Sequence, residues 1–314
     1  MKNIPIGHHE AADLRTRVDR ILRDLGSPEP PVDLTAVREL LRLDRQYYSS
    51  SDDSAIREVV HKLTIAGKQI LARPTLLLDV VRKAQLSALF IPDRKRILID
   101  AETPTLKQRW YETHEIGHSL AEWHGAFLYG DSEETLSPTC REQLEAEANY
   151  AAGQLLFMRE RFTQDALDLS RSINSVRDLA KRFGNTITST LWRYVEEIHH
   201  GEPLVGVVTP TTRTDAAWNG HAHLPNRYCI ESPAFRERFG QISEQELLQV
   251  ISSYTTYRRA GPLGDSEVVL VDRNGDRHVF YFETFSNGYS RLTLGIYRRP
   301  ATLAVLVTAA GAHA

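Results

Sequence analysis

Two histidines and a glutamate stand together in this chain in an order typical of a metal-binding helix. His114 and His118 are four residues apart, and Glu115 directly follows the first of them, which gives the pattern HExxH. On an α-helix a step of four residues turns a side chain by only about 40° and raises it by about 6 Å. Both imidazoles therefore emerge on one face and can bind one metal ion, with Glu115 beside it as a base for a water molecule.

The residues around this motif predict the helix that the chemistry needs. Thr103 and Pro104 are typical of an N-cap and a first helical residue. Apolar residues then recur without a helix breaker as far as Gly125, so we expect a helix of about 20 residues. Before its start, two short apolar runs, residues 86–91 and 96–100, predict a β-hairpin that leads directly into the helix.

An edge strand of this hairpin has two interpretations. Beside a metal site, it could accept an extended peptide by backbone pairing. It could also be a purely structural hairpin.

The composition is that of a soluble globular protein. Of the 314 residues, 41% are hydrophobic and 25% are charged, and the length suffices for two domains. A net charge of −3 makes direct nucleic-acid binding unfavourable. Residues 1–5 lack the apolar core of a signal peptide, and no apolar run is long enough to span a membrane, so we expect a cytoplasmic protein. The two cysteines, Cys140 and Cys229, cannot form a disulfide framework.

The periodicity of the chain predicts an α+β protein. Helical patterns cover residues 9–25, 33–41, 55–71, 74–83, 140–157, 162–169, 176–183 and 188–199. The last pair is more typical of an αα-hairpin than of a DNA-binding helix-turn-helix, because the chain has no basic excess. From about residue 204 the pattern becomes β-rich. A strand at 204–208 and a helix at 244–254 precede strands at 267–271, 278–285 and 290–297, which two Asn-Gly turns join into an antiparallel meander, and a closing strand is expected at 303–307.

Three parts follow from these patterns. We expect residues 1–54 to form an N-terminal helical segment packed on the HExxH domain, residues 55–203 to form that mainly helical domain with a small sheet beside the HExxH helix, and residues 204–314 to form a C-terminal α+β regulatory or docking domain.

A catalytic zinc site needs a third protein ligand in addition to the two histidines. His124 is six residues after His118, which resembles the HExxHxxGxxH arrangement of the metzincins, but Ala121 replaces the glycine and favours a continuous helix. His124 would then be a partly exposed residue near the helix end.

Glu145 on the following helix is the preferred third ligand. Asn149 shares its face and could accept a hydrogen bond from the free N–H of a ligating histidine. Glu142 on the same face is the fallback, and Glu147 is expected to face elsewhere.

The motifs together resemble the ImmA/IrrE family of metallopeptidases. The resemblance rests on Arg109-Trp110 before His114-Glu115-Ile116-Gly117-His118, and on the run Glu145-Ala146-Glu147-Ala148-Asn149-Tyr150-Ala151-Ala152-Gly153-Gln154-Leu155-Leu156. It implies Glu145 as the third zinc ligand. It also implies cleavage of a helix-turn-helix repressor, which releases genes for stress response, mobile-element transfer or phage defence. Phe157-Met158-Arg159 departs from the family's usual Met-Pro and leaves the end of that helix open.

The prediction is therefore a zinc-dependent endopeptidase with His114, His118 and Glu145 as ligands and Glu115 as general base. The alternative is a non-catalytic metal-binding sensor or antitoxin-like interaction protein, against which the intact Glu115 argues. Cys140 stands five residues before Glu145. Its thiolate could occupy the open zinc position and hold the protease latent, or it could be a small buried residue at a helix start.

Overall fold

The computed structural model describes residues 6–48, 88–91, 95–101, 103–121, 123–124, 138–199, 201–211 and 228–301. The chain divides into two compact units, one of residues 1–164 with 181–186, the other of residues 165–180 with 187–314. The expected boundaries at residues 54 and 204 stay predictions. The helices expected at 55–71 and 74–83 and the strand expected at 303–307 lie outside the described residues.

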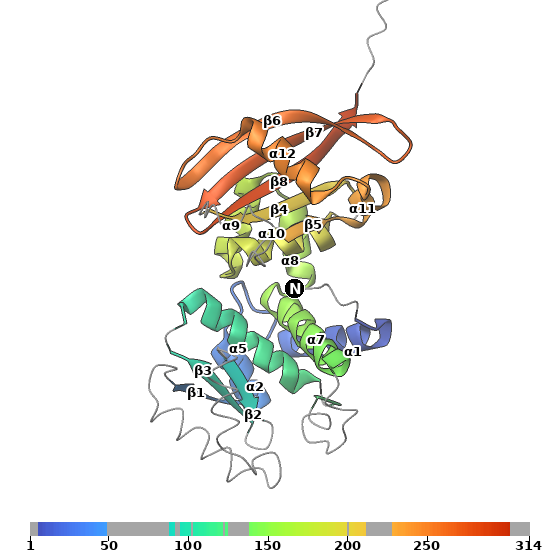
Figure 1. The fold of residues 1–314 in the computed structure, drawn as a ribbon. Helices are drawn as coiled ribbons and strands as arrows, with labels where there is room; N and C mark the ends of the chain where they lie inside the picture. Colours follow the sequence, from blue (N-terminus) through green and yellow to red (C-terminus); the bar gives the residue numbers. More distant parts are fainter. Residues whose placement is uncertain are drawn as a thin grey trace, which may run out of the picture. The chain divides into compact units, whose positions relative to one another are not determined.

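The first unit combines helices with a small mixed sheet (Figure 1). The sheet has the order β1-β3-β2, in which β1 (Asp44–Tyr48) runs parallel and β2 (Ala88–Ile91) antiparallel to β3 (Arg96–Asp100). The predicted hairpin is therefore confirmed as β2 and β3. The helices of this part are α1 (His8–Asp24), α2 (Leu34–Leu41), α5 (Thr105–Leu120), α7 (Pro138–Leu156) and the start of α8 (Glu160–Leu167).

A buried carboxylate holds the motif helix α5 against the N-terminal part of the chain. Glu112 is the first buried residue of α5, and its two oxygens accept hydrogen bonds from Arg38 Nε of α2 at 2.6 Å and from Arg45 Nη1 of β1 at 3.0 Å. Charge-assisted bonds of this kind are stronger and more directional than neutral ones. The two arginines therefore fix the position of α5 relative to α2 and the sheet.

The helix α5 is shorter than the sequence predicts. It begins at Thr105, with Pro104 in the N-cap position, and it ends at Leu120 instead of running on to Gly125. Ala121 has an extended backbone with φ −89° and ψ 90°. The prediction of a continuous helix was wrong. The intrinsic helix preference of alanine is worth less than about 1 kcal/mol. The hydrogen bonds of Trp123 and His124 with Glu147 outweigh it.

The second unit contains a five-stranded antiparallel sheet. Its order is β5-β4-β8-β7-β6, and the strands are β4 (Leu204–Pro210), β5 (Tyr228–Glu231), β6 (Ala260–Val271), β7 (Arg277–Asn287) and β8 (Ser290–Pro300). The predicted meander is confirmed as β6, β7 and β8. Gly275 and Gly288 adopt positive φ in its two turns, as the Asn-Gly pairs require.

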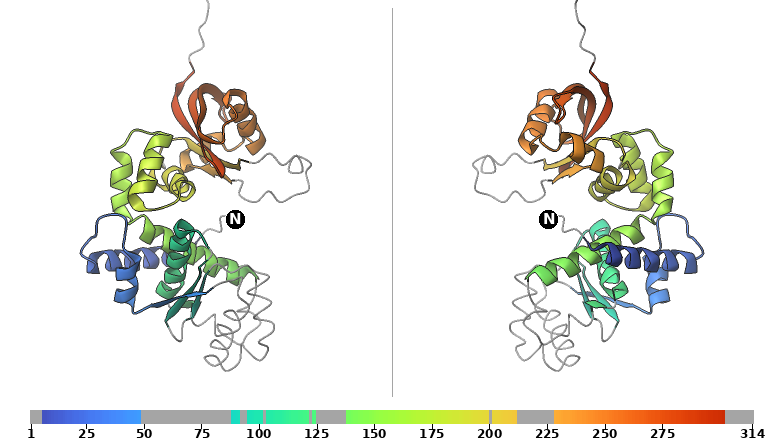
Figure 2. Two further views of the ribbon diagram at one scale, coloured as in Figure 1. Left: turned by 90° about the vertical axis from the view of Figure 1, so that its left-hand side faces the viewer. Right: turned by 90° about the vertical axis from the view of Figure 1, so that its right-hand side faces the viewer.

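Helices pack on both faces of this sheet (Figure 2). α11 (Pro233–Phe239) and α12 (Glu244–Tyr254) cover one face. The core between them and the strands includes Val205, Val207, Phe235, Phe239, Leu247, Ile251, Phe280 and Phe282. On the other face, Gly206 lies against Leu191 of α10 (Ile187–Arg193) and Val195 of the π-helical turn η3 (Tyr194–Ile198). The N-terminus of α9 (Ile173–Phe183) contacts Glu283 of β7.

The architecture is thus α+β, as predicted, with a mainly helical first part and a sheet-based second part. No helix among the described residues is long and apolar enough to cross a membrane.

Candidate metal centre

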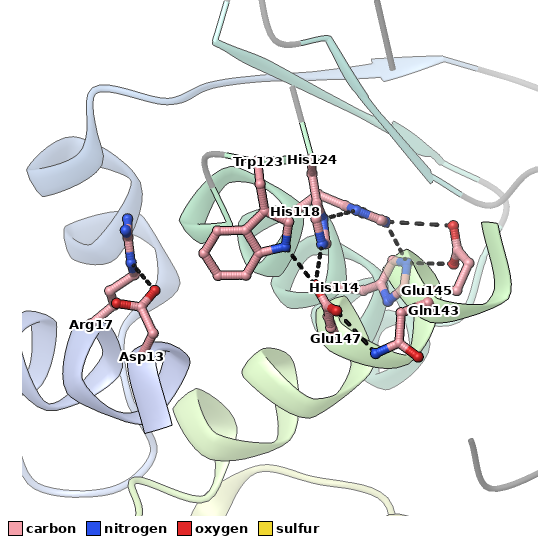
Figure 3. Close-up of polar contacts among 9 residues, drawn as sticks. All are labelled: Asp13, Arg17, His114, His118, Trp123, His124, Gln143, Glu145 and Glu147. Carbon is pink, nitrogen blue, oxygen red and sulfur yellow. Dashed lines mark hydrogen bonds and ion pairs between the residues drawn. The ribbon is translucent and has the colours of Figure 1, made fainter. Parts of the chain in front are cut away.

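The two histidines of the motif and Glu145 meet at one point (Figure 3). His114 Nε2 lies 3.2 Å from His118 Nε2 and 3.1 Å from Glu145 Oε2. His118 Nε2 lies 3.6 Å from Glu145 Oε1. Within the described part of the chain, these three residues are the group whose ligand atoms converge closely enough to hold a metal ion.

These spacings fit a tetrahedral zinc ion. Bonds of about 2.0–2.2 Å place the ligand atoms of tetrahedral zinc about 3.3–3.6 Å apart. The two Nε2 atoms are 3.2 Å apart, and they lie 3.1 Å and 3.6 Å from Oε2 and Oε1 of Glu145, which is close to that range. Two nitrogens and one carboxylate oxygen are also the donor set of a catalytic zinc site that leaves a fourth position open.

The hydrogen bond of His114 sets its tautomer. His114 Nδ1 lies 3.0 Å from Asn149 Oδ1, which only accepts hydrogen bonds. Nδ1 must therefore carry the proton, and in the neutral ring Nε2 presents a lone pair to Glu145 and His118. Asn149 thus contacts a histidine of the motif, as its position on the same helix face as Glu145 predicted. The role of Asn149 in zinc binding stays a prediction.

His118 contacts His124, for which the prediction from the sequence was wrong. His118 Nδ1 lies 2.9 Å from His124 Nδ1, because the chain turns back after Leu120. His124 is not the partly exposed residue expected at a helix end, since it is only 1% exposed. It lies behind His118, on the side away from Glu145, and outside the group of converging ligand atoms.

Glu147, which was expected to face elsewhere than Glu145, lies outside the converging group and contacts His124 instead. Its Oε2 lies 2.9 Å from His124 Nε2 and accepts a hydrogen bond from Trp123 Nε1 at 2.6 Å, while Oε1 accepts one from Gln143 Nε2 at 3.0 Å. Burial alone would raise the pKa of Glu147, but the three donors, with His124 first, lower it overall. The i,i+4 spacing of Gln143 and Glu147 was visible in the sequence, but nothing there indicated a partner beyond α7.

The electrostatics of the centre favour an ionised carboxylate. Burial by itself would raise the pKa of Glu145, but hydrogen bonds and charge from His114 and His118 outweigh it and hold the pKa well below its usual range. For His114, burial lowers the pKa, but the hydrogen bond that a protonated Nε2 would donate to Glu145, together with the charges of Glu115 and Glu145, raises it overall. Glu115 is 7% exposed, and its charge is felt at His114.

Glu142 and Cys140 are the two further candidates. Glu142, the fallback ligand, is exposed and does not belong to the converging group. Cys140 lies in the first turn of α7, and its side chain lies outside the described part of the structure, so its regulatory role stays a prediction.

Comparison with known proteins shows what this part of the chain is similar to. No curated protein matches the chain. Among solved structures the chain is similar to a Mycobacterium tuberculosis transcriptional regulator, with 13% identity and a TM-score of 0.51 over 93% of this chain and 89% of that one, which concerns the fold alone. Residues 74–193, which include the HExxH helix and Glu145, match the model of the IrrE N-terminal-like domain. This match to a peptidase family model confirms the resemblance to ImmA/IrrE peptidases inferred from the motifs.

Proposed function

We propose that this protein is a zinc-dependent endopeptidase with His114, His118 and Glu145 as the metal ligands. The observation that carries the proposal is the convergence of two imidazole lone pairs and one carboxylate, with Glu115 buried beside them. Without a cation, the two Nε2 atoms and the two carboxylate oxygens of Glu145, with contacts of 3.1–3.6 Å, would repel one another whenever both rings are neutral. The match to a peptidase family supports hydrolysis as the reaction.

The chemistry divides between the metal and Glu115. A bound zinc ion would polarise the peptide carbonyl and make an adjacent water molecule more acidic. Glu115 accepts the proton of the attacking water and delivers it to the leaving amine nitrogen. The C–O bond forms as the C–N bond breaks, so one water molecule is consumed for each peptide bond cleaved.

The substrate in this proposal is a protein, and specifically a helix-turn-helix repressor whose cleavage releases stress-response, mobile-element or phage-defence genes. The resemblance of the motifs to ImmA/IrrE peptidases supports this choice. The sheet offers a way to bind such a chain, because β2 is an outer strand of the three described strands and α5 packs against both β2 and β3. A substrate segment in extended conformation would pair with the backbone of β2.

The test compares the wild type with Glu115→Gln. Both proteins are loaded with zinc, their metal content is measured, and each is incubated with the helix-turn-helix protein encoded by the neighbouring gene. We expect one zinc per chain in both, and cleavage at one site by the wild type alone. A loss of about 10²–10⁴-fold or more is expected when a general base is removed.

Two results would overturn the proposal. Cleavage by Glu115→Gln at the wild-type rate would remove Glu115 from the chemistry. Stoichiometric zinc without cleavage by either protein, together with tight binding to the repressor, would favour the non-catalytic, antitoxin-like alternative.

A further inference from the structure

We propose that His124 and Glu147 are positioning residues that fix the tautomer of His118 and so set the affinity of the centre for zinc. This inference deepens the proposed function and rests on it, because it takes His118 as a ligand. It concerns two residues on the far side of the His118 ring, behind the converging ligand atoms.

The direction of the hydrogen bonds that join His118, His124 and Glu147 follows from Glu147, the last of the three. Glu147 receives three donors, and an ionised carboxylate only accepts. His124 Nε2 must therefore carry a proton and donate it to Glu147. In the neutral His124 ring, Nδ1 is then an acceptor, and the contact at 2.9 Å requires His118 Nδ1 to be the donor.

The consequence appears at the metal-facing nitrogen. With its proton on Nδ1, the neutral ring of His118 presents an unprotonated Nε2 to His114 and Glu145. The negative charge of Glu147 reaches His118 through one intervening imidazole and favours a basic Nε2. Partners of this kind behind a ligating histidine are typically worth about 10–100-fold in metal affinity.

The Nδ1 atoms of the two motif histidines thus have different hydrogen-bond partners. His114 donates to the neutral amide of Asn149, which comes from α7, two residues beyond Glu147. His118 donates to an imidazole that is itself held by a carboxylate. The opposite pairing, with His124 as a donor to His118, would leave His124 Nε2 and the Glu147 carboxylate as two acceptors facing each other at 2.9 Å.

The fold keeps these residues in place. The chain leaves the helical path at Ala121, which brings Trp123 and His124 back towards α7. The Trp123 ring lies under the guanidinium of Arg17 of α1, 5.8 Å from the ring centre, and Arg17 is itself paired with Asp13 at 2.7 Å (Figure 3). The contact from α1 thus reaches the indole whose N–H donates to Glu147.

The experiment measures zinc affinity by competition with a chromophoric chelator, in the full-length protein. Glu147→Gln is expected to weaken zinc binding by about 10–100-fold. In the zinc-free protein, two-bond ¹⁵N–¹H correlation spectra of the histidine rings report the tautomer of His118. The wild type should show a protonated Nδ1, and Glu147→Gln should show increased protonation of Nε2, because an amide can donate to His124 and reverse both bonds.

Two control variants separate this effect from general damage. Glu142→Gln makes the same change at an exposed site of the same helix and should bind zinc as the wild type does. Trp123→Phe removes one hydrogen bond from Glu147 but leaves its charge and His124, so the tautomer should be retained.

A second pair of variants keeps the inference testable if Glu147→Gln folds poorly. In His124→Gln the amide oxygen can accept from His118 and the amide nitrogen can donate to Glu147, so zinc affinity should stay close to that of the wild type. His124→Leu fills similar space without either bond and should lose affinity by the same factor as Glu147→Gln. Equal zinc affinity in both His124 variants would mean that His124 only fills space, and would overturn the inference.

The outcomes also distinguish this inference from the proposed function. A wild type that binds zinc but cleaves no repressor contradicts the protease, while the affinity and tautomer measurements still stand. A wild type that cleaves, with unchanged zinc affinity and unchanged His118 tautomer in folded Glu147→Gln, contradicts the positioning role alone.

Discussion

Gly117 of α5 lies directly against Ala148 of α7. A Cβ atom on Gly117 would be 2.6 Å from the Ala148 carbonyl oxygen and 3.2 Å from its carbonyl carbon. Gly117 stands between the two motif histidines, and Ala148 stands between Glu145 and Asn149. The two helices therefore touch at the place from which His114 and Glu145 reach each other, so the missing side chain sets the spacing of the metal centre.

Gly117→Ala should push the two helices apart and weaken zinc binding. Alanine gains up to about 1 kcal/mol in helix preference over glycine, but overpacking of a tight contact costs about 1–3 kcal/mol. Gly153→Ala on α7 is the matched control, because a Cβ there meets no atom within 4 Å, and it should be neutral or stabilising. Thermal unfolding and zinc content are measured for both. Wild-type zinc affinity in Gly117→Ala would show that the spacing tolerates an extra methyl group.

Glu145→Ala should release the metal, because it removes the single carboxylate of the converging group. The loss of affinity should exceed the about 10–100-fold expected when a hydrogen-bond partner of a ligand is removed. Metal analysis after dialysis checks this, with His124→Ala in parallel. His124→Ala should bind zinc more weakly than the wild type but more tightly than Glu145→Ala. The reverse order of the two variants would transfer the ligand role to His124.

The centre could be predicted from sequence where helix geometry alone determines it. Residues four apart on α5 and on α7 share a face, so His114 with His118 and Glu145 with Asn149 were predictable. The turn at Ala121 was not, since it depends on bonds from Trp123 and His124 to Glu147, which is 23 residues further along than His124. Local preference carries no information on such contacts.

The fold shows the same division. The meander was predictable from its Asn-Gly turns. The first half of β6 was not, because Gly261, Pro262 and Gly264 are unfavourable in strands and the register shifts between Pro262 and Gly264. The short elements β5 and α11 were also missed. α11 has a Ser232 N-cap and Pro233 as signals, but only seven residues. Short elements of this kind are stabilised by packing on the sheet more than by their own sequence.

Cys140→Ser tests whether the thiol regulates the centre. If the thiolate occupies the open zinc position, basal cleavage by the variant should exceed that of the wild type, because zinc binds thiolate strongly. The comparison is made under reducing and oxidising conditions, and Cys229→Ser serves as the control. Cys229 is suited to that role because burial, followed by the charges of Glu231 and Glu244, raises its pKa to about 12, so its thiol stays unreactive. Equal activities in Cys140→Ser and the wild type would leave Cys140 as a packing residue.

Asp272 in the turn between β6 and β7 should make the stability of the second unit depend on pH. Its Oδ1 accepts hydrogen bonds from the backbone N–H groups of Asn274 and Asp276, and its Oδ2 lies 2.9 Å from His278 Nε2. Burial would raise the pKa of Asp272, but the hydrogen bonds from His278 and the two N–H groups lower it overall, below its ordinary value of 3.8.

A carboxyl group whose pKa is lower in the folded state stabilises the fold above its unfolded pKa and loses this contribution as the pH falls through the folded value. Asp272→Asn should therefore unfold at a lower temperature than the wild type at pH 7, and the difference should shrink as the pH falls below about 3.8. Thermal unfolding between pH 2 and pH 7 measures this, with Asp276→Asn as the control, because Asp276 is exposed in the same turn. A difference between Asp272→Asn and the wild type that stays constant over this range would mean that the shape of the side chain, and not its charge, stabilises the turn.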